Sequence, residues 1–244
     1  MKTVFLASVA AATLIAAPAM AQEVVGSAGI GYGYTDIEGL DVDSATLDGV
    51  AAFKVAPEWT VTVAGDVTYS DTDFGDDTTG AVSAHLTKSF ANDIRAGGFV
   101  KMSDIGGEDV FTVGGEVQKH YAKTTLTGEV AYTDLNSNDV WSMGGDVAYY
   151  INPDLRLNAG ASYASIDTGY GDLDAWVYGA GAEYKFANSP FSVSATYTHS
   201  DVEGIDADAI MIGARYNFGG TLQALDHAGA NLGRTLATFV GSAF

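Results

Sequence analysis

Charged side chains at alternate positions are the residues of this chain with the clearest chemical capacity. Six acids and six bases form the set, and each has small, apolar or aromatic neighbours on both sides. Alternate residues of an extended strand share one face, so we predict that these side chains point to a common interior. There they either pair with one another or line a water-filled passage and sort solutes by charge. The set comprises Asp48, Lys54, Asp66, Arg95, Lys101, Glu116, Glu129, Asp146, Arg156, Glu183, Lys185 and Arg215.

Histidine is the residue that most often serves as a catalytic base, and the chain has four: His85, His120, His199 and His227. Hydrolytic chemistry also needs a nucleophile within hydrogen-bond reach of the base. The sequence contains no G-x-S-x-G nucleophile motif. We therefore expect no catalytic residues and no enzymatic activity. A hydrolase that pairs His199 with a loop carboxylate stays open as an alternative, and activity on lipid or peptide substrates would support it.

Two further patterns match ligand sites only in part. Residues 29–33 have alternate glycines like a dinucleotide-binding loop, but they lie in a predicted strand that no helix follows. The acidic stretch 71–77 lacks the spacing and the closing Glu of a calcium-binding loop. We expect no cofactor and no metal ligand. Divalent ions held loosely between acidic loops and lipopolysaccharide stay open as an alternative.

The elements that carry these residues follow a period of two. Between residues 60 and 70, Val61, Val63, Val67 and Tyr69 alternate with polar residues, which predicts a strand with one apolar face. Segments of this kind occupy residues 24–35, 44–55, 59–70, 79–90, 94–103, 110–121, 124–133, 140–151, 155–165, 174–186, 191–200 and 207–218. Each has 10 to 13 residues, enough for a tilted strand to cross a bilayer.

The connections between these segments fall into two classes. Short connections follow the even-numbered segments and contain Pro57, Pro153 and Pro190, where a missing N–H disturbs no strand pairing. Longer acidic connections follow the odd-numbered segments, at 36–43, 71–77, 104–109, 134–139, 166–173 and 201–206. Tight turns on one side and longer loops on the other are typical of a transmembrane barrel. The sequence therefore predicts an all-β fold, a transmembrane antiparallel up-and-down β-barrel of twelve strands.

The placement of apolar and aromatic residues favours a membrane barrel over a secreted sandwich or adhesin. One face of each segment is apolar, and its charged exceptions lie near segment ends, where they can reach the membrane interface. These exceptions are Lys88, Lys119, His199 and Asp208. Aromatic residues gather at both ends of the same face, like the two girdles of a barrel in a bilayer. The opposite face is polar and charged, which a close-packed soluble core buries only at high cost.

Composition and the N-terminus limit the compartment and the partners. Residues 1–21 have the features of a signal peptide: Lys2, an apolar stretch and the cleavage pattern Ala19-Met20-Ala21. The chain has no Cys, so no disulfide holds the fold. Its 31 acids against 11 bases exclude nucleic acid as a partner, because phosphates are neutralised by Lys and Arg. We expect export through the periplasm after removal of the signal peptide.

The last predicted strand, Met211-Ile-Gly-Ala-Arg-Tyr216-Asn-Phe218, resembles the β-signal of outer-membrane barrels at Gly213, Tyr216 and Phe218. With the alternating strands and the Pro-containing turns, it makes residues 22–218 resemble the small porins of Gram-negative bacteria. The resemblance implies a place in the bacterial outer membrane, in contact with lipid and lipopolysaccharide. It also implies that the barrel-assembly machinery recognises the last strand. One departure is that 26 residues follow Phe218, whereas many such proteins end at this aromatic residue.

Residues 219–244 form a C-terminal tail that we place on the periplasmic side. Leu222, Leu225 and Leu232 indicate a weak helical period, which Gly229 and Gly233 interrupt. Three arrangements stay open for this tail: it is disordered, it docks under the barrel, or it enters the barrel as a plug.

The predicted function is passive diffusion of small polar solutes or ions through the lumen, with a preference for cations at the acidic outer mouth. Barrels of eight strands are filled by their own side chains, and those of 16 to 18 enclose a channel. Twelve strands lie between these limits, so a closed structural or adhesive barrel with acidic surface loops is the alternative. The sequence leaves open which solutes pass and whether copies form a homo-oligomer.

Overall fold

The computed structural model describes residues 24–73, 75–105, 107–135, 138–167 and 171–234, so the predicted signal peptide lies outside the described residues. One short helix, α2 (Leu222–Ala228), follows the strands. The strands are β1 (Val24–Ile37), β2 (Leu40–Ala56), β3 (Trp59–Thr72), β4 (Gly75–Phe90), β5 (Ile94–Ile105), β6 (Glu108–His120), β7 (Thr124–Leu135), β8 (Asn138–Asn152), β9 (Leu155–Asp167), β10 (Asp172–Lys185), β11 (Phe191–Val202) and β12 (Ile205–Phe218).

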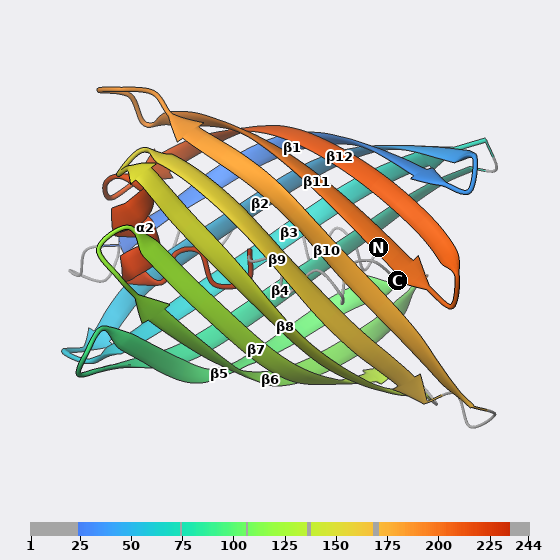
Figure 1. Cartoon of the computed structure of the whole chain (residues 1–244), viewed down its shortest axis with the longest axis horizontal. Helices are drawn as coiled ribbons and strands as arrows, with labels where there is room; N and C mark the ends of the chain where they lie inside the picture. Colours follow the sequence, from blue (N-terminus) through green and yellow to red (C-terminus); the bar gives the residue numbers. More distant parts are fainter. Residues whose placement is uncertain (1–23, 74, 106, 136–137, 168–170, 235–244) are drawn as a thin grey trace.

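The strands form one closed barrel in which all neighbours are antiparallel (Figure 1). Each strand pairs with the strand that follows it in the chain, and β12 closes on β1 over the register from Gly26↔Phe218 to Ile37↔Ala207. Because period-two alternation and short turns favour consecutive pairing, the sequence predicts this topology directly. The predicted antiparallel up-and-down barrel of twelve strands is confirmed.

The strands extend further into the acidic connections than the sequence predicts. β1 and β2 continue to a turn at Glu38 and Gly39, both with positive φ, where a loop over 36–43 was expected. Tyrosine hydroxyls on the outer face donate to carboxylates of the next strand, as from Tyr34 to Asp41 at 2.6 Å. The same pairing joins Tyr132 to Asp139, Tyr163 to Asp174 and Tyr197 to Asp208. The acidic residues therefore sit within paired strands, because these hydrogen bonds compensate for their low strand propensity.

The outer surface of the barrel is apolar. Large apolar or aromatic side chains are exposed on every strand, for example Ile30, Leu47, Tyr69, Leu86, Val100, Val113, Leu126, Met143, Leu157, Trp176, Val193 and Ile210. Such a continuous apolar surface is unfavourable in water and matches lipid hydrocarbon.

No helix within the described residues is long and apolar enough to span a membrane.

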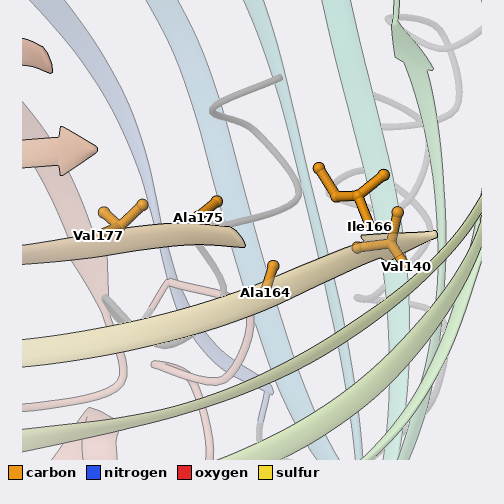
Figure 2. Packing of buried hydrophobic residues seen from close by; sticks show 5 residues of the cluster. All are labelled: Val140, Ala164, Ile166, Ala175 and Val177. Carbon is orange, nitrogen blue, oxygen red and sulfur yellow. The ribbon is translucent and has the colours of Figure 1, made fainter. Parts of the chain in front are cut away.

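The inner wall also has an apolar region, which the sequence did not predict. Figure 2 shows Val140 of β8, Ala164 and Ile166 of β9, and Ala175 and Val177 of β10 as one buried cluster. Val140 pairs with Ile166 and Ala164 with Ala175, so the cluster crosses three strands at the end of the barrel that carries the longer hairpins. The inner wall is therefore polar in most places but apolar on this side.

Helix α2 lies in the barrel mouth at the end with the short turns (Figure 1). Thr221 caps its N-terminus through a hydrogen bond from the Ala224 N–H, and Gly229 ends it in the left-handed conformation. Leu222 packs against Ala148 and Tyr150 of β8. Of the three arrangements considered for the tail, residues 219–234 adopt the one in which the segment enters the barrel.

Candidate functional site in the barrel lumen

The predicted lumen residues lie on the inner face of the strands. Six of them are buried, namely Arg95, Glu116, Asp146, Arg156, Glu183 and Arg215, although the outer face of the same strands is exposed. Lys54 lies in the inward register opposite Thr60 but is exposed at the barrel end. The remaining five, Asp48, Asp66, Lys101, Glu129 and Lys185, are half-buried. Their inward direction agrees with the alternation, and their role in lining a conducting path stays a prediction.

The acids and bases of the wall pair with one another near the short-turn end. Arg215 of β12 donates to Asp48 Oδ2 of β2, with its Nη1 atom at 2.7 Å. Arg156 lies 3.9 Å from Glu183 on the neighbouring strand, and Ser192 also donates to Glu183 at 2.7 Å. These partners offset the cost of burying the charges. The wall is therefore charged but locally balanced at this level.

The C-terminal segment 219–234 is held to the wall by polar contacts on several strands. Arg95 of β5 donates to the backbone carbonyls of Asp226 at 3.3 Å and His227 at 2.5 Å. The Tyr150 hydroxyl of β8 donates to Asp226 Oδ2 at 2.9 Å. Thr62 of β3 donates to the carbonyl of Gly229 at 3.1 Å. The segment is therefore fixed from opposite sides of the lumen.

Arg234, at the end of the described chain, reaches furthest into the charged network. Its guanidinium lies 3.9 Å from Asp48 Oδ2 and 3.8 Å from Glu183 Oε2, and it donates to Ser27 Oγ at 3.4 Å. Burial, and then the neighbouring Arg215, lower the pKa of Arg234 to about 10, so it is charged at neutral pH. Arg234 therefore joins the two wall pairs Asp48–Arg215 and Glu183–Arg156 into one network.

A small cavity remains between this segment and the wall. It has a volume of about 60 Å³ and is lined by Asp48, Asp66, Lys101 and Arg234 among others. Because one water occupies about 30 Å³ in the liquid, this space holds only a few waters. Two carboxylates and two cationic groups thus face a narrow space inside the barrel.

Three buried residues, Ser83, His85 and Glu116, are arranged in the order of a hydrolase triad, which was not predicted from the sequence. Ser83 Oγ lies 3.0 Å from His85 Nε2, and His85 Nδ1 lies 3.0 Å from Glu116 Oε2. Gly233 covers this group, since a Cβ on Gly233 would lie 3.1 Å from Nε2 and 3.2 Å from Ser83 Oγ. Ser83 and His85 are buried, and the space beside them is the small cavity of about 60 Å³ described above. The arrangement satisfies three buried polar groups.

The pairing of His199 with a loop carboxylate, considered from the sequence, is present on the outer face of the barrel. Its Nδ1 lies 2.9 Å from Asp208 and its Nε2 lies 3.5 Å from Asp206. The ring also contacts Tyr178, with the ring centroids 4.8 Å apart. The hydrogen bond of its ring is with the Asp208 carboxylate and involves no hydroxyl nucleophile. The described residues also contain no group of three or more His, Asp or Glu side chains placed to hold a metal ion.

Sequence reasoning missed the residues of the C-terminal segment that take part in the lumen. Tyr150 was not considered as a lumen residue, whereas its side chain is fully buried inside against Asp226. Asp226, His227 and Arg234 were not considered as lumen residues. One signal was present: Arg234 is the only Lys or Arg after Arg215, and it follows a segment with weak helical period.

The predicted β-signal residues lie in β12, and the alternation of the strand divides them between its inner and outer faces. Gly213 lies in the inward register of Arg215, and Tyr216 is exposed on the outside. Phe218 pairs with Gly26 at the strand end. Recognition of these residues by an assembly machinery stays a prediction.

Comparison with known proteins gives a consistent fold. A family model described as "Outer membrane protein beta-barrel domain" matches residues 52–218. No curated protein matches the sequence. Among solved structures, the KdgM porin is similar with a TM-score of 0.58 and 10% identity, over 78% of this chain and 99% of the porin.

Two further channels have a similar fold. The COG4313 outer membrane channel from Pseudomonas putida F1 has a TM-score of 0.61 and 11% identity, over 80% of this chain and 95% of that channel. The NanC porin has a TM-score of 0.59 and 11% identity, over 78% of this chain and 98% of that porin. At these identities the likeness concerns the fold alone.

Proposed function

Because the chain belongs to the family of outer-membrane β-barrel domain proteins, we propose that it is a porin for passive diffusion of small hydrophilic solutes or ions. One observation carries the proposal: the closed barrel has an apolar outer wall and an inner wall with charges of both signs. Charged side chains that face a lumen act on passing ions through their field. The similar folds of two proteins named porins and of one named channel support this proposal.

We further propose that the channel prefers cations. Exposed carboxylates crowd the hairpins at the end opposite α2, for example Asp41, Asp43, Asp76, Asp77, Asp109, Asp139, Asp174 and Asp206. A mouth with charges of one sign raises the local concentration of counter-ions. This attraction is screened at high salt, so the cation preference is expected to weaken as ionic strength rises.

The test is single-channel recording of the refolded, full-length mature protein in a planar bilayer under a salt gradient. We expect stable discrete openings, with a reversal potential shifted toward the equilibrium potential of the cation. A shift of apparent size on heating, seen on a gel, confirms beforehand that the barrel is folded. Silence from the folded barrel would contradict the porin proposal, and an anion-side reversal potential would contradict cation preference.

A second candidate is the closed structural or adhesive barrel. The network around Arg234 favours it, because the wall charges are paired and the C-terminal segment occupies the barrel mouth. This function predicts no conductance from a folded barrel, together with binding of surface ligands that is lost when the hairpin carboxylates are changed to amides. The recording described above separates the two candidates.

We propose no enzymatic activity for the lumen, since Ser83 and His85 are buried and the cavity beside them has a volume of only about 60 Å³. In the cell, the proposed surroundings are outer-membrane lipid and lipopolysaccharide, and the proposed assembly partner is the barrel-assembly machinery. Export through the periplasm is proposed from residues 1–21, and N-terminal sequencing of the mature protein tests it. A start other than near Gln22 would argue against this cleavage site. No nucleic-acid partner is proposed for so acidic a chain.

A further inference from the structure

We propose that the C-terminal segment 219–234 is a built-in constriction of the channel and that Arg234 determines its ion selectivity. The inference rests on the proposed channel function. It assigns to this channel a selectivity residue that does not belong to the barrel wall.

Apolar packing and hydrogen bonds hold the segment 219–234 in a fixed position inside the lumen. α2 and the turn after it place Leu225 and Ala230 against Ala52 in one buried apolar cluster. Arg95 and Tyr150 bind the same short stretch from two separate strands, β5 and β8. A segment held by apolar packing and by hydrogen bonds to several strands is more costly to displace than one held at a single point.

Arg234 changes the charge balance at the depth of the lumen where Asp48 and Glu183 lie. Without it, Asp48 has Arg215 as its partner and Glu183 has Arg156, so the two wall pairs are balanced. With Arg234 between them, three guanidinium groups face two carboxylates. Asp66, which pairs with Asp48 in the register, and Lys101 lie beside the same cavity. Arg234 therefore adds one positive charge to a part of the lumen that holds carboxylates and cations together, whereas the hairpins at the other end are acidic.

The position of this charge beside the small cavity gives it influence on ions. Arg234 and Lys101 line the cavity together with Asp48 and Asp66. A unit charge about 6 Å from an ion in water changes the local ion concentration by about threefold. The effect has opposite sign for cations and anions, so the permeability ratio responds strongly to this one residue.

The first experiment compares Arg234→Gln with the wild-type protein in the bilayer assay under a potassium chloride gradient. We expect the cation-to-anion permeability ratio to rise at least about threefold, because one positive charge beside the cavity is removed. Arg234→Lys keeps the charge and is expected to restore most of the wild-type reversal potential. Lys88→Gln is the matched control: it removes one positive charge from a side chain that is paired with Glu58 in the outward register of β4, and it is expected to leave the reversal potential unchanged.

A disulfide between the segment 219–234 and the barrel wall shows whether a change in selectivity comes from the lost charge or from movement of the segment. The chain has no Cys, so the pair Ala52→Cys and Ala230→Cys, which replaces two alanines of one buried cluster, introduces the only thiols. Oxidation of this pair holds the segment in place. We expect the oxidised protein to conduct like the reduced protein, and Arg234→Gln to shift selectivity equally in both.

Three outcomes would overturn the inference while leaving the porin function intact. They are an unchanged reversal potential in Arg234→Gln, a shift that Lys88→Gln reproduces, and a shift that vanishes when the segment is tethered. If the wild-type protein itself forms no channel, the proposed function fails first, and the inference fails with it.

Discussion

A lysine placed at the middle of the outer wall tests the lipid-facing assignment directly. Val130 on β7 is 58% exposed and lies six residues along the strand from Thr124, at the strand start. Both side chains belong to the outward register. Six residues at about 3.3 Å each are about 20 Å of strand, or about 14 Å of depth at a tilt of about 45°. Since the apolar band is about 25 Å tall, Val130 lies near its centre and Thr124 near its edge.

The expected costs of the same substitution at these two positions differ. Val130→Lys is expected to lower the free energy of unfolding by about 2–4 kcal/mol, whereas Thr124→Lys is expected to cost about 0–1 kcal/mol because its ammonium reaches the interface. The assay is denaturant unfolding in lipid vesicles, followed by tryptophan fluorescence, with both midpoints and slopes compared. Equal losses at the two positions, or no loss at Val130, would refute the assignment of this face to lipid.

Three further changes test the interior, the assembly strand and the buried serine. Tyr150→Phe leaves Asp226 without the Tyr150 hydroxyl and should lower the free energy of unfolding by about 1–3 kcal/mol. The control is Tyr149→Phe on the outer face, and equal effects of the two changes would argue against the lumen contact. Phe218→Ala should reduce the folded barrel recovered from membranes but not refolding in detergent, and losses in both would indicate a defect of stability instead of recognition. A fluorophosphonate probe should leave Ser83 unlabelled, and labelling that His85→Ala abolishes would reopen the hydrolase alternative.

The sequence by itself determined the strands, their order and their faces. Alternation with a period of two assigns every residue of a strand to one side, and a slip by one residue would turn all apolar side chains inward. Asp66, Glu129 and Arg215 could therefore be placed inside without any structure. The turns at Pro57, Pro153 and Pro190 then left consecutive pairing as the simple topology.

Strand ends were predicted less well, because the acidic residues there have low strand propensity. In the structure their carboxylates accept hydrogen bonds from tyrosines across the hairpin, such as Tyr34 to Asp41. Pairings of this kind depend on the register of two strands, so local propensity underestimates the length of β1 and β2.

Only the tertiary structure decided how the interior is filled. Arg234 meets Asp48 and Asp226 meets Tyr150 across sequence separations that no local pattern encodes. The segment 219–234 has a weak helical period and two glycines, so its position depends on partners that the closed barrel provides. Alternation shows which side a residue faces, whereas the contacts it makes across the lumen arise only when twelve strands close around it.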